Sequence, residues 1–167
     1  MIGKDRQALV RVETLYLETS ILGYLTARST PNPIVTANIE VTKEWWRSRR
    51  SAFEIYVSRA VLNEVSRGDA EMAALRLDFI RGFRLLGIDR SVEELAARFL
   101  LETNLPPKAE IDALHIATAT VHRMNYLLTW NCKHIANATI GRKLRQISLD
   151  LGYELPIICT PYELLAE

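Results

Sequence analysis

The sequence has few cysteines, and the two that it contains, Cys132 and Cys159, lie far apart and show no CxxC spacing. This argues against a disulfide framework and against a cysteine-based zinc site, and it favours reduced thiols in a cytoplasmic protein. No stretch approaches the roughly 18 uninterrupted apolar residues of a membrane span. The first residues also lack the apolar core of a signal peptide. We therefore expect a cytoplasmic protein with no membrane partner.

A strong charge of one sign is also missing. Lys and Arg number 21 against 20 acids, so the net charge is +1 and no global electrostatic signal points to nucleic acid. With 49% hydrophobic and 25% charged residues among 167, the composition is that of an ordinary globular domain able to bury a core. No repeat or low-complexity tract divides the chain, and we expect a single domain over residues 1–167.

Short apolar runs alternate with longer helical patterns along the chain. The runs expected as strands are Leu15 to Leu17, Ile55 to Val57, Leu85 to Ile88, Tyr126 to Trp130 and Ile157 to Thr160. They show no clear period of two, which indicates strands that are covered on both faces. The pattern predicts an α/β fold, a three-layer α/β/α sandwich around a mostly parallel sheet of about five strands.

Two capping boxes mark expected helix starts. Ser91 is followed three residues later by Glu94, and Thr160 by Glu163 with a proline at the first helical position. In such a box the two side chains satisfy backbone N–H groups that the helix leaves unpaired. We expect one helix to begin at each box.

Residues 33–50 carry apolar side chains at helical spacing. Ile34, Val41 and Trp45 fall on one face of a helix over this segment. We therefore expect an amphipathic helix that buries this face and ends in a basic turn.

Three acids lie where a lone carboxylate is costly. Glu18 follows the first expected strand, Glu64 lies just past the second, and Asp112 opens a segment, residues 113–122, without Lys, Arg, Asp or Glu. An unpaired carboxylate in such surroundings would shift its pKa and become neutral, so a divalent cation is a natural partner. Strand ends and a helix N-terminus can meet at the carboxyl edge of a sheet. We expect the three acids to form a metal-binding pocket there.

Each of these acids also has an ordinary interpretation. Glu18 could cap the following helix or pair with an arginine, and Glu64 could be a solvated helix residue. Asp112 lies in the first turn of its expected helix, where the helix dipole accepts negative charge. His115 lies on the same side of that helix, and without a cysteine or a third histidine nearby we favour a hydrogen-bonded core histidine over a zinc ligand.

Four segments together resemble the PIN-domain nucleases, and within them the VapC-type toxins of type II toxin-antitoxin systems. They are Tyr16-Leu17-Glu18-Thr19-Ser20, Leu62-Asn63-Glu64-Val65, Asp112 to Ala119, and Leu127-Leu128-Thr129-Trp130-Asn131. Their order and spacing match the family pattern over nearly the whole chain, and the Asp112 block is the most specific. Two positions differ: Glu18 stands where the family usually has Asp, and Asn131 where it commonly has a fourth acid.

The resemblance implies a Mg²⁺- or Mn²⁺-dependent endoribonuclease that hydrolyses RNA phosphodiesters and acts as a toxin. Glu18, Glu64 and Asp112 would hold the ion, directly or through water, with Asn131 as a fourth catalytic residue. The hydroxyl groups that would orient ligands or water are those of Thr19, Ser20 and Thr129. The implied partners are the RNA substrate, an antitoxin protein and a second copy of the chain in a homodimer.

Two other functions stay open at this point. Asn131 keeps a carbonyl donor but removes a charge, which would suit a PIN-like module with weakened catalysis that binds RNA or a protein partner. A phosphohydrolase of small molecules would use the same acids, although the sequence has no DxD after its first strand and no glycine-rich phosphate loop.

Further contacts to RNA are open as well. The basic groups at residues 47–50 and 142–145 are candidates for tracking an RNA backbone, and His134 for touching phosphate. Trp45 and Trp46 are expected in the core or against a partner subunit rather than stacked on bases.

Overall fold

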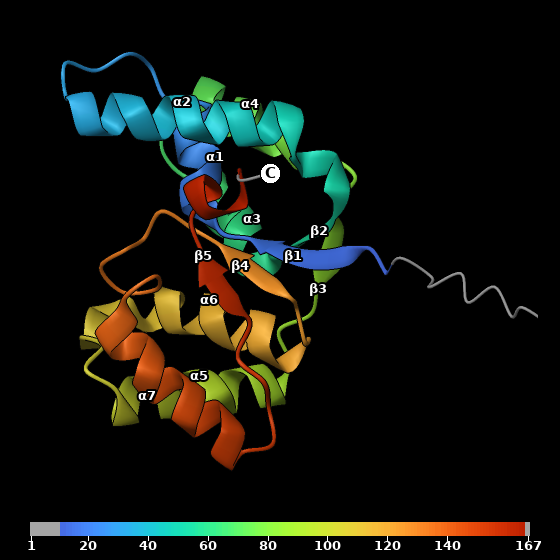
Figure 1. Ribbon diagram of the computed structural model, residues 1–167, viewed down its shortest axis with the longest axis vertical. Helices are drawn as coiled ribbons and strands as arrows, with labels where there is room; N and C mark the ends of the chain where they lie inside the picture. Colours follow the sequence, from blue (N-terminus) through green and yellow to red (C-terminus); the bar gives the residue numbers. More distant parts are fainter. Residues whose placement is uncertain (1–10, 166–167) are drawn as a thin grey trace, which may run out of the picture.

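The centre of the molecule is one sheet of five parallel strands in the order β3-β2-β1-β4-β5 (Figure 1). The structure is a computed structural model that describes residues 11–165. The strands are β1 (Glu13–Leu17), β2 (Phe53–Ser58), β3 (Arg84–Leu86), β4 (Tyr126–Leu128) and β5 (Ile157–Cys159). The helices are α1 (Thr19–Leu25), α2 (Pro33–Ser48), α3 (Arg59–Val65), α4 (Ala70–Phe79), α5 (Arg90–Glu102), α6 (Glu110–Val121) and α7 (Ala138–Asp150), and the short 3₁₀ helices are η1 (Arg50–Ala52), η2 (Pro107–Ala109) and η3 (Pro161–Leu164).

Strand β1 is the middle of the sheet, with β2 on one side and β4 on the other. Leu15 lies opposite Ile55 of β2 and Tyr126 of β4, and Leu15, Tyr16 and Leu17 are fully buried. A parallel strand that is covered on both faces needs apolar side chains in both directions, which is why its sequence shows no alternation. The predicted α/β fold with five strands is confirmed, and each expected run contributes one strand.

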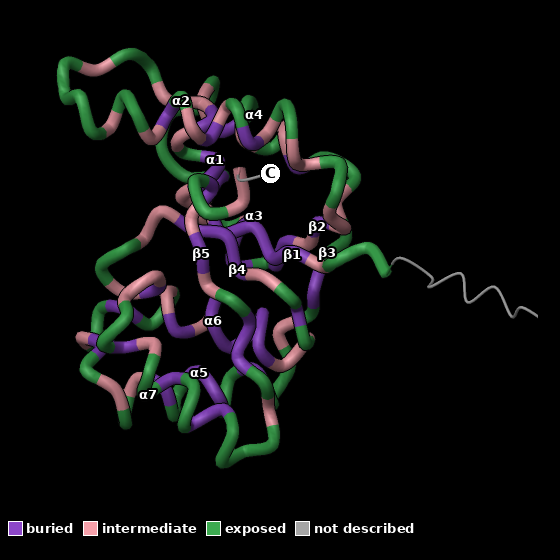
Figure 2. The backbone as a smooth tube through the Cα atoms, in the orientation of Figure 1, coloured by how far each residue is buried: buried purple, intermediate pink, exposed green. Residues whose placement is uncertain are grey.

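Helices cover the sheet from two sides (Figure 1). Helices α1, α2 and α4 lie above the strands in this view, and α5, α6 and α7 lie below them. Helix α6 packs against α5, and α5 against α7. Figure 2 shows the resulting burial, which is densest along the central strands and α6. None of the helices within residues 11–165 has the length and apolar character needed to cross a membrane.

The carboxyl ends of the parallel strands meet at one edge of the sheet. Glu18 follows β1 directly, and Thr129 follows β4. Ser58 is the last residue of β2, and α3 begins at the next residue. The two prolines at the start of η2, Pro106 and Pro107, separate α5 from α6, and α6 then begins beside this edge. The topology thus places three polar chain segments next to one another without any need for a long loop.

Two expectations about helix ends have different outcomes. The Thr160–Glu163 capping box is present, with both of its hydrogen bonds, at the start of η3. The expected start at Ser91 is wrong, because Asp89 accepts a hydrogen bond from the N–H of Val92 at 3.1 Å and α5 begins at Arg90. Aspartate is among the strongest N-cap residues, and here it acts two positions earlier than the serine.

The expected buried face of α2 is correct only near the end of the helix. Trp45 is fully buried, as predicted, together with Ile39 and Thr42, but Ile34 is 72% exposed. The first half of α2 projects beyond the sheet in Figure 1, and among the described residues this half contributes no fully buried side chain before Ile39. Helical spacing defines a face, and the length of the neighbouring elements decides how much of that face is buried.

Candidate metal centre at the carboxyl edge of the sheet

Glu18 lies at the junction of β1 and α1 and is 5% exposed. One oxygen of its carboxylate, Oε2, accepts hydrogen bonds from Ser20 Oγ at 2.5 Å and from Thr129 Oγ1 at 2.7 Å. The side chain makes no cap hydrogen bond to α1, although Glu18 occupies the N-cap position. Among the described residues, it also pairs with no Lys or Arg. Neither ordinary interpretation of this acid therefore applies.

Glu64 lies in the last turn of α3 and is half-buried, so it is not a solvated helix residue. Its Oε2 accepts hydrogen bonds from Thr19 Oγ1 at 2.5 Å and from His115 Nε2 at 2.7 Å. Burial alone would raise the pKa of this carboxyl. The hydrogen bond and charge of His115 outweigh burial, with help from Thr19 and the nearby Arg67, and lower the pKa below its ordinary value. Glu64 is therefore ionised at neutral pH.

A chain of buried hydrogen bonds holds His115 against Glu64. His115 Nδ1 contacts the hydroxyl of Tyr16 at 2.7 Å, and that hydroxyl contacts Ser58 Oγ, also at 2.7 Å. Burial raises the pKa of Tyr16, so the phenol keeps its proton. A carboxylate can only accept, so His115 Nε2–H donates to Glu64; Nδ1 accepts from the Tyr16 hydroxyl when the imidazole is neutral and donates to it when the imidazole is charged. Both arrangements give every group in the chain a partner, and the expected hydrogen-bonded core histidine is observed.

Asp112 lies in the first turn of α6, and both of its oxygens are occupied. Oδ1 accepts from Asn131 Nδ2 at 2.9 Å, and Oδ2 accepts from His134 Nδ1 at 2.7 Å. Asn131 Oδ1 in turn accepts from the backbone N–H of His134 at 3.0 Å, which fixes the amide with its NH₂ toward Asp112. The loop after β4 therefore holds this carboxylate in one orientation.

Thr129 connects the two halves of the site. Its Oγ1 donates to Glu18 and accepts from the N–H of Asn131 at 2.9 Å. Ser20 Oγ likewise accepts from the N–H of Trp130 at 2.8 Å. The hydroxyl groups that follow β1 and β4 thus fix the positions of both Glu18 and the loop that contacts Asp112.

The structure brings Glu18, Glu64 and His115 together, with one ligand atom from each lying within 4.8 Å of the others. Asp112 is not part of this group and reaches it through Asn131 and Thr129. In the part of the chain that the structure describes, every hydrogen bond to the carboxylates of Glu18 and Glu64 goes to Oε2, so Oε1 of each is left without a donor.

Among the described residues, the three carboxylates are partnered only by hydroxyl, amide and imidazole groups. Within residues 11–165 none of them forms an ion pair with Lys or Arg. Negative charge at this density favours a cation. His115 is a poor ligand for it, because its Nε2 is committed to Glu64. The donors that remain are carboxylate oxygens, which suit Mg²⁺ or Mn²⁺ better than Zn²⁺.

Tyr16→Phe is expected to weaken Mn²⁺ binding about tenfold, because it removes the hydroxyl that orients His115 and, through it, Glu64. The unpaired Nδ1 and Ser58 hydroxyl would also cost roughly 1–3 kcal/mol of unfolding free energy. Calorimetric titration with Mn²⁺ and urea unfolding measure the two effects. Tyr126→Phe is the matched control, since the Tyr126 hydroxyl contacts Glu13 at the amino end of the sheet. Unchanged Mn²⁺ affinity in Tyr16→Phe would contradict a positioning role.

Reasoning from the sequence did not predict that four residues, Tyr16, Ser58, His115 and His134, hold the acids in place. Ser58 ends a strand at the same edge as Glu18, Tyr16 precedes Glu18 by two positions on the same side of β1, and His115 follows Asp112 by one helical turn. These spacings were available signals. His134 was a candidate for touching phosphate, and the structure shows that its Nδ1 donates to Asp112.

Comparison with solved structures finds the same fold in Mycobacterium tuberculosis VapC20, described as a sarcin-ricin loop cleaving toxin. The match has a TM-score of 0.58 at 17% sequence identity and covers 75% of this chain and 96% of the other. No curated protein sequence matches this chain. The sequence model of the PIN domain matches residues 15–133, from β1 to the loop that carries Asn131. Because this match spans more than half of the chain, the protein belongs to the PIN-domain family.

Proposed function

We propose that the protein is a Mg²⁺- or Mn²⁺-dependent endoribonuclease. The observation that carries this proposal is the set of three acids at the carboxyl edge, without Lys or Arg partners among the described residues and with Oε1 of both Glu18 and Glu64 left for a cation. Membership in the PIN-domain family, whose nucleases hydrolyse phosphodiesters, supports it. VapC20, which has the same fold, cleaves the sarcin-ricin loop, and this supports RNA as the substrate class.

Some side chains of the site would bind the ion, and others would orient those ligands. Glu18 and Glu64 would hold the ion through Oε1, and Asp112 would do so directly or through water. Asn131 and His134 would keep Asp112 in place, and the hydroxyl groups that would do the same for the other two acids are those of Thr19, Ser20 and Thr129. When bound, the ion supplies positive charge that activates a water molecule and offsets charge on the phosphoryl oxygens.

The test is cleavage of a structured RNA by purified protein in the presence of Mn²⁺. We expect cleavage by the wild type, no cleavage in EDTA, and a loss of roughly 10³-fold or more in Asp112→Ala, because several kcal/mol of charge stabilisation disappear with a ligand of the ion. Gel analysis of end-labelled RNA measures all three. Full activity in Asp112→Ala would remove the nuclease proposal.

One observation favours a catalytically weakened module as the alternative. Both oxygens of Asp112 already accept hydrogen bonds, from Asn131 and His134, and Asn131 supplies no negative charge. Binding of RNA without metal-dependent cleavage would support this module. Hydrolysis of small phosphate esters alone would instead support a phosphohydrolase.

We further propose that the nuclease is the toxin of a toxin-antitoxin pair and acts as a homodimer. Resemblance to the VapC-type toxins and the shared fold with VapC20 support this. Growth arrest on expression, relieved by the product of a small neighbouring gene, is the expected result. Growth that is unaffected by an active nuclease would count against the toxin role.

A further inference from the structure

Positive charge is concentrated in one segment next to the candidate metal centre. Residues 131–149 contain four cations, Lys133, Arg142, Lys143 and Arg145, and no Asp or Glu. The chain as a whole has a net charge of only +1, so this is a local excess. It begins immediately at Asn131, which contacts Asp112.

Part of this charge lines a hollow of about 470 Å³, which we name the lysine hollow. Its wall comes from the segment before α6, the loop after β4 and the start of α7. The lining residues are Asn104, Pro106, Lys108, Lys133, His134, Asn137, Thr139 and Ile140. No acid is among them, and within the described residues neither Lys108 nor Lys133 forms an ion pair. Lys143 adds a third ammonium group at the wall by donating to Asn104 Oδ1 at 3.0 Å.

The lysine hollow adjoins the acidic site through one shared residue. His134 lines the hollow and also donates from Nδ1 to Asp112 Oδ2. A phosphodiester chain that reaches the carboxylates from this side therefore passes the lysines first. A second hollow, beside Arg142 and Arg145, does not combine unpaired cations with a contact to the acidic site. Glu163 also lines it, and none of its lining residues forms a hydrogen bond with Glu18, Glu64 or Asp112.

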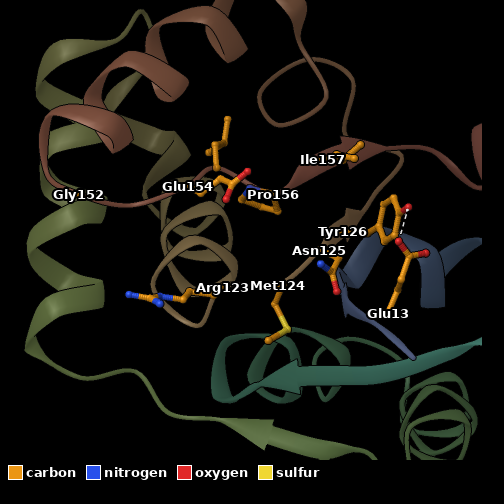
Figure 3. Close-up of a pocket in the computed structure, with 10 residues that line it drawn as sticks. Glu13, Arg123, Met124, Asn125, Tyr126, Gly152, Glu154, Pro156 and Ile157 are labelled. Atoms are coloured by element: carbon orange, nitrogen blue, oxygen red, sulfur yellow. Dashed lines mark hydrogen bonds between the residues drawn. The ribbon is translucent and has the colours of Figure 1, made fainter. Parts of the chain in front are cut away.

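A hollow at the opposite edge of the sheet has the wrong charge for a polyanion. It lies at the amino ends of β1, β4 and β5, and its side chains are drawn in Figure 3. Glu13 and Glu154 line it against a single cation, Arg123. The charge of the lysine hollow is thus specific to the edge that carries the metal centre.

We propose that the lysine hollow binds the phosphate backbone of the RNA strand beside the phosphodiester that is cleaved. The inference rests on the proposed function, which supplies RNA as the ligand. Three carboxylates repel a polyanion, and ammonium groups alongside them offset that repulsion while contacting phosphates without regard to base sequence. Lysine suits this role, because its ammonium group is a point charge with freely rotating donors.

The test compares two double variants of equal net charge in a Glu18→Gln background, which is expected to bind RNA without cleaving it. One is Lys108→Ala with Lys133→Ala. The other is Arg81→Ala with Arg123→Ala, two exposed residues that precede β3 and β4 and therefore lie at the opposite edge. Fluorescence anisotropy of a labelled single-stranded RNA, repeated over a range of salt concentrations, gives Kd and its salt dependence.

The lysine pair is expected to bind RNA roughly tenfold more weakly at about 0.1 M salt, with the slope of log Kd against log salt reduced by about 1.4, or 0.7 for each lost phosphate contact on a single strand. The arginine pair should change Kd less than about twofold. Lys108→Arg with Lys133→Arg should retain binding, since the charge is kept. Circular dichroism confirms that each variant is folded.

Equal Kd and equal slope in the two alanine pairs would overturn the inference. Cleavage by the protein with Lys108 and Lys133 intact is measured separately, so the two proposals fail independently. Absence of cleavage together with lysine-dependent RNA binding would remove the nuclease and keep the hollow. For this purpose Lys108→Ala with Lys133→Ala is also made with Glu18 intact, and cleavage with an unchanged KM in that variant would remove the hollow and keep the nuclease.

Discussion

Glu18→Gln and Glu64→Gln are each expected to lower the rate of RNA cleavage roughly 10³-fold while leaving the fold intact. Glutamine can present its carbonyl oxygen at the Oε2 position, where Glu18 accepts from Ser20 and Thr129, and where Glu64 accepts from Thr19 and His115. Its NH₂ then replaces Oε1, the oxygen left for the cation. The substitution removes a metal ligand and keeps every observed hydrogen bond.

Single-turnover cleavage and thermal unfolding are the two measurements. Glu110→Gln is the matched control, because Glu110 is an exposed acid on α6 two positions before Asp112 and takes no part in the hydrogen bonds of the site. We expect it to keep its activity within about twofold. Wild-type rates in Glu18→Gln at limiting Mn²⁺ would show that this carboxylate does not hold the ion.

Mn²⁺ at about 100 times its Kd is expected to stabilise the wild type by about 2.7 kcal/mol, since an ion that binds only the folded chain shifts the unfolding equilibrium by mass action. For a chain of this length that corresponds to a rise in Tm of roughly 5–10 °C. The sign follows from the site: the acids repel one another without a cation, and their oxygens come together only in the folded chain.

Differential scanning calorimetry of chelated and Mn²⁺-loaded protein checks the expected rise in Tm. Glu64→Gln should lose most of the increase, and Glu110→Gln should keep it. An equal rise in all three proteins would mean that Mn²⁺ binds elsewhere. This experiment needs no RNA, so it tests the metal centre even if the substrate is wrongly assigned.

The strands and their common edge could be predicted because the signal was local. Apolar runs such as Leu15 to Leu17 report burial on both faces, and the acid that follows a buried strand in a parallel sheet has only one edge to occupy. Thr129 and Asn131 lie at the end of the expected strand over Tyr126 to Trp130, so the same reasoning applies to them.

The contacts around the acids could not be read in the same way. Glu64 and His115 are 51 residues apart, and their hydrogen bond depends on the angle at which α6 passes α3. The hydrogen bond between His134 and Asp112 depends on the path of the loop after β4, which apolar periodicity does not describe. The predicted burial of Ile34 was wrong for a related reason, because the sequence of α2 does not report the length of the neighbouring helices and strands.

The amide of Asn131 has a consequence for how the site is assembled. A carboxylate at this position would face Asp112 with like charge, and the loop after β4 would need a counterion to settle there. The NH₂ of Asn131 instead donates to Asp112, so two strands and a helix are joined by neutral bridges before any ion arrives. We therefore expect the loop after β4 to keep the same geometry with and without a bound cation, because its contacts to Asp112 and Thr129 do not require one.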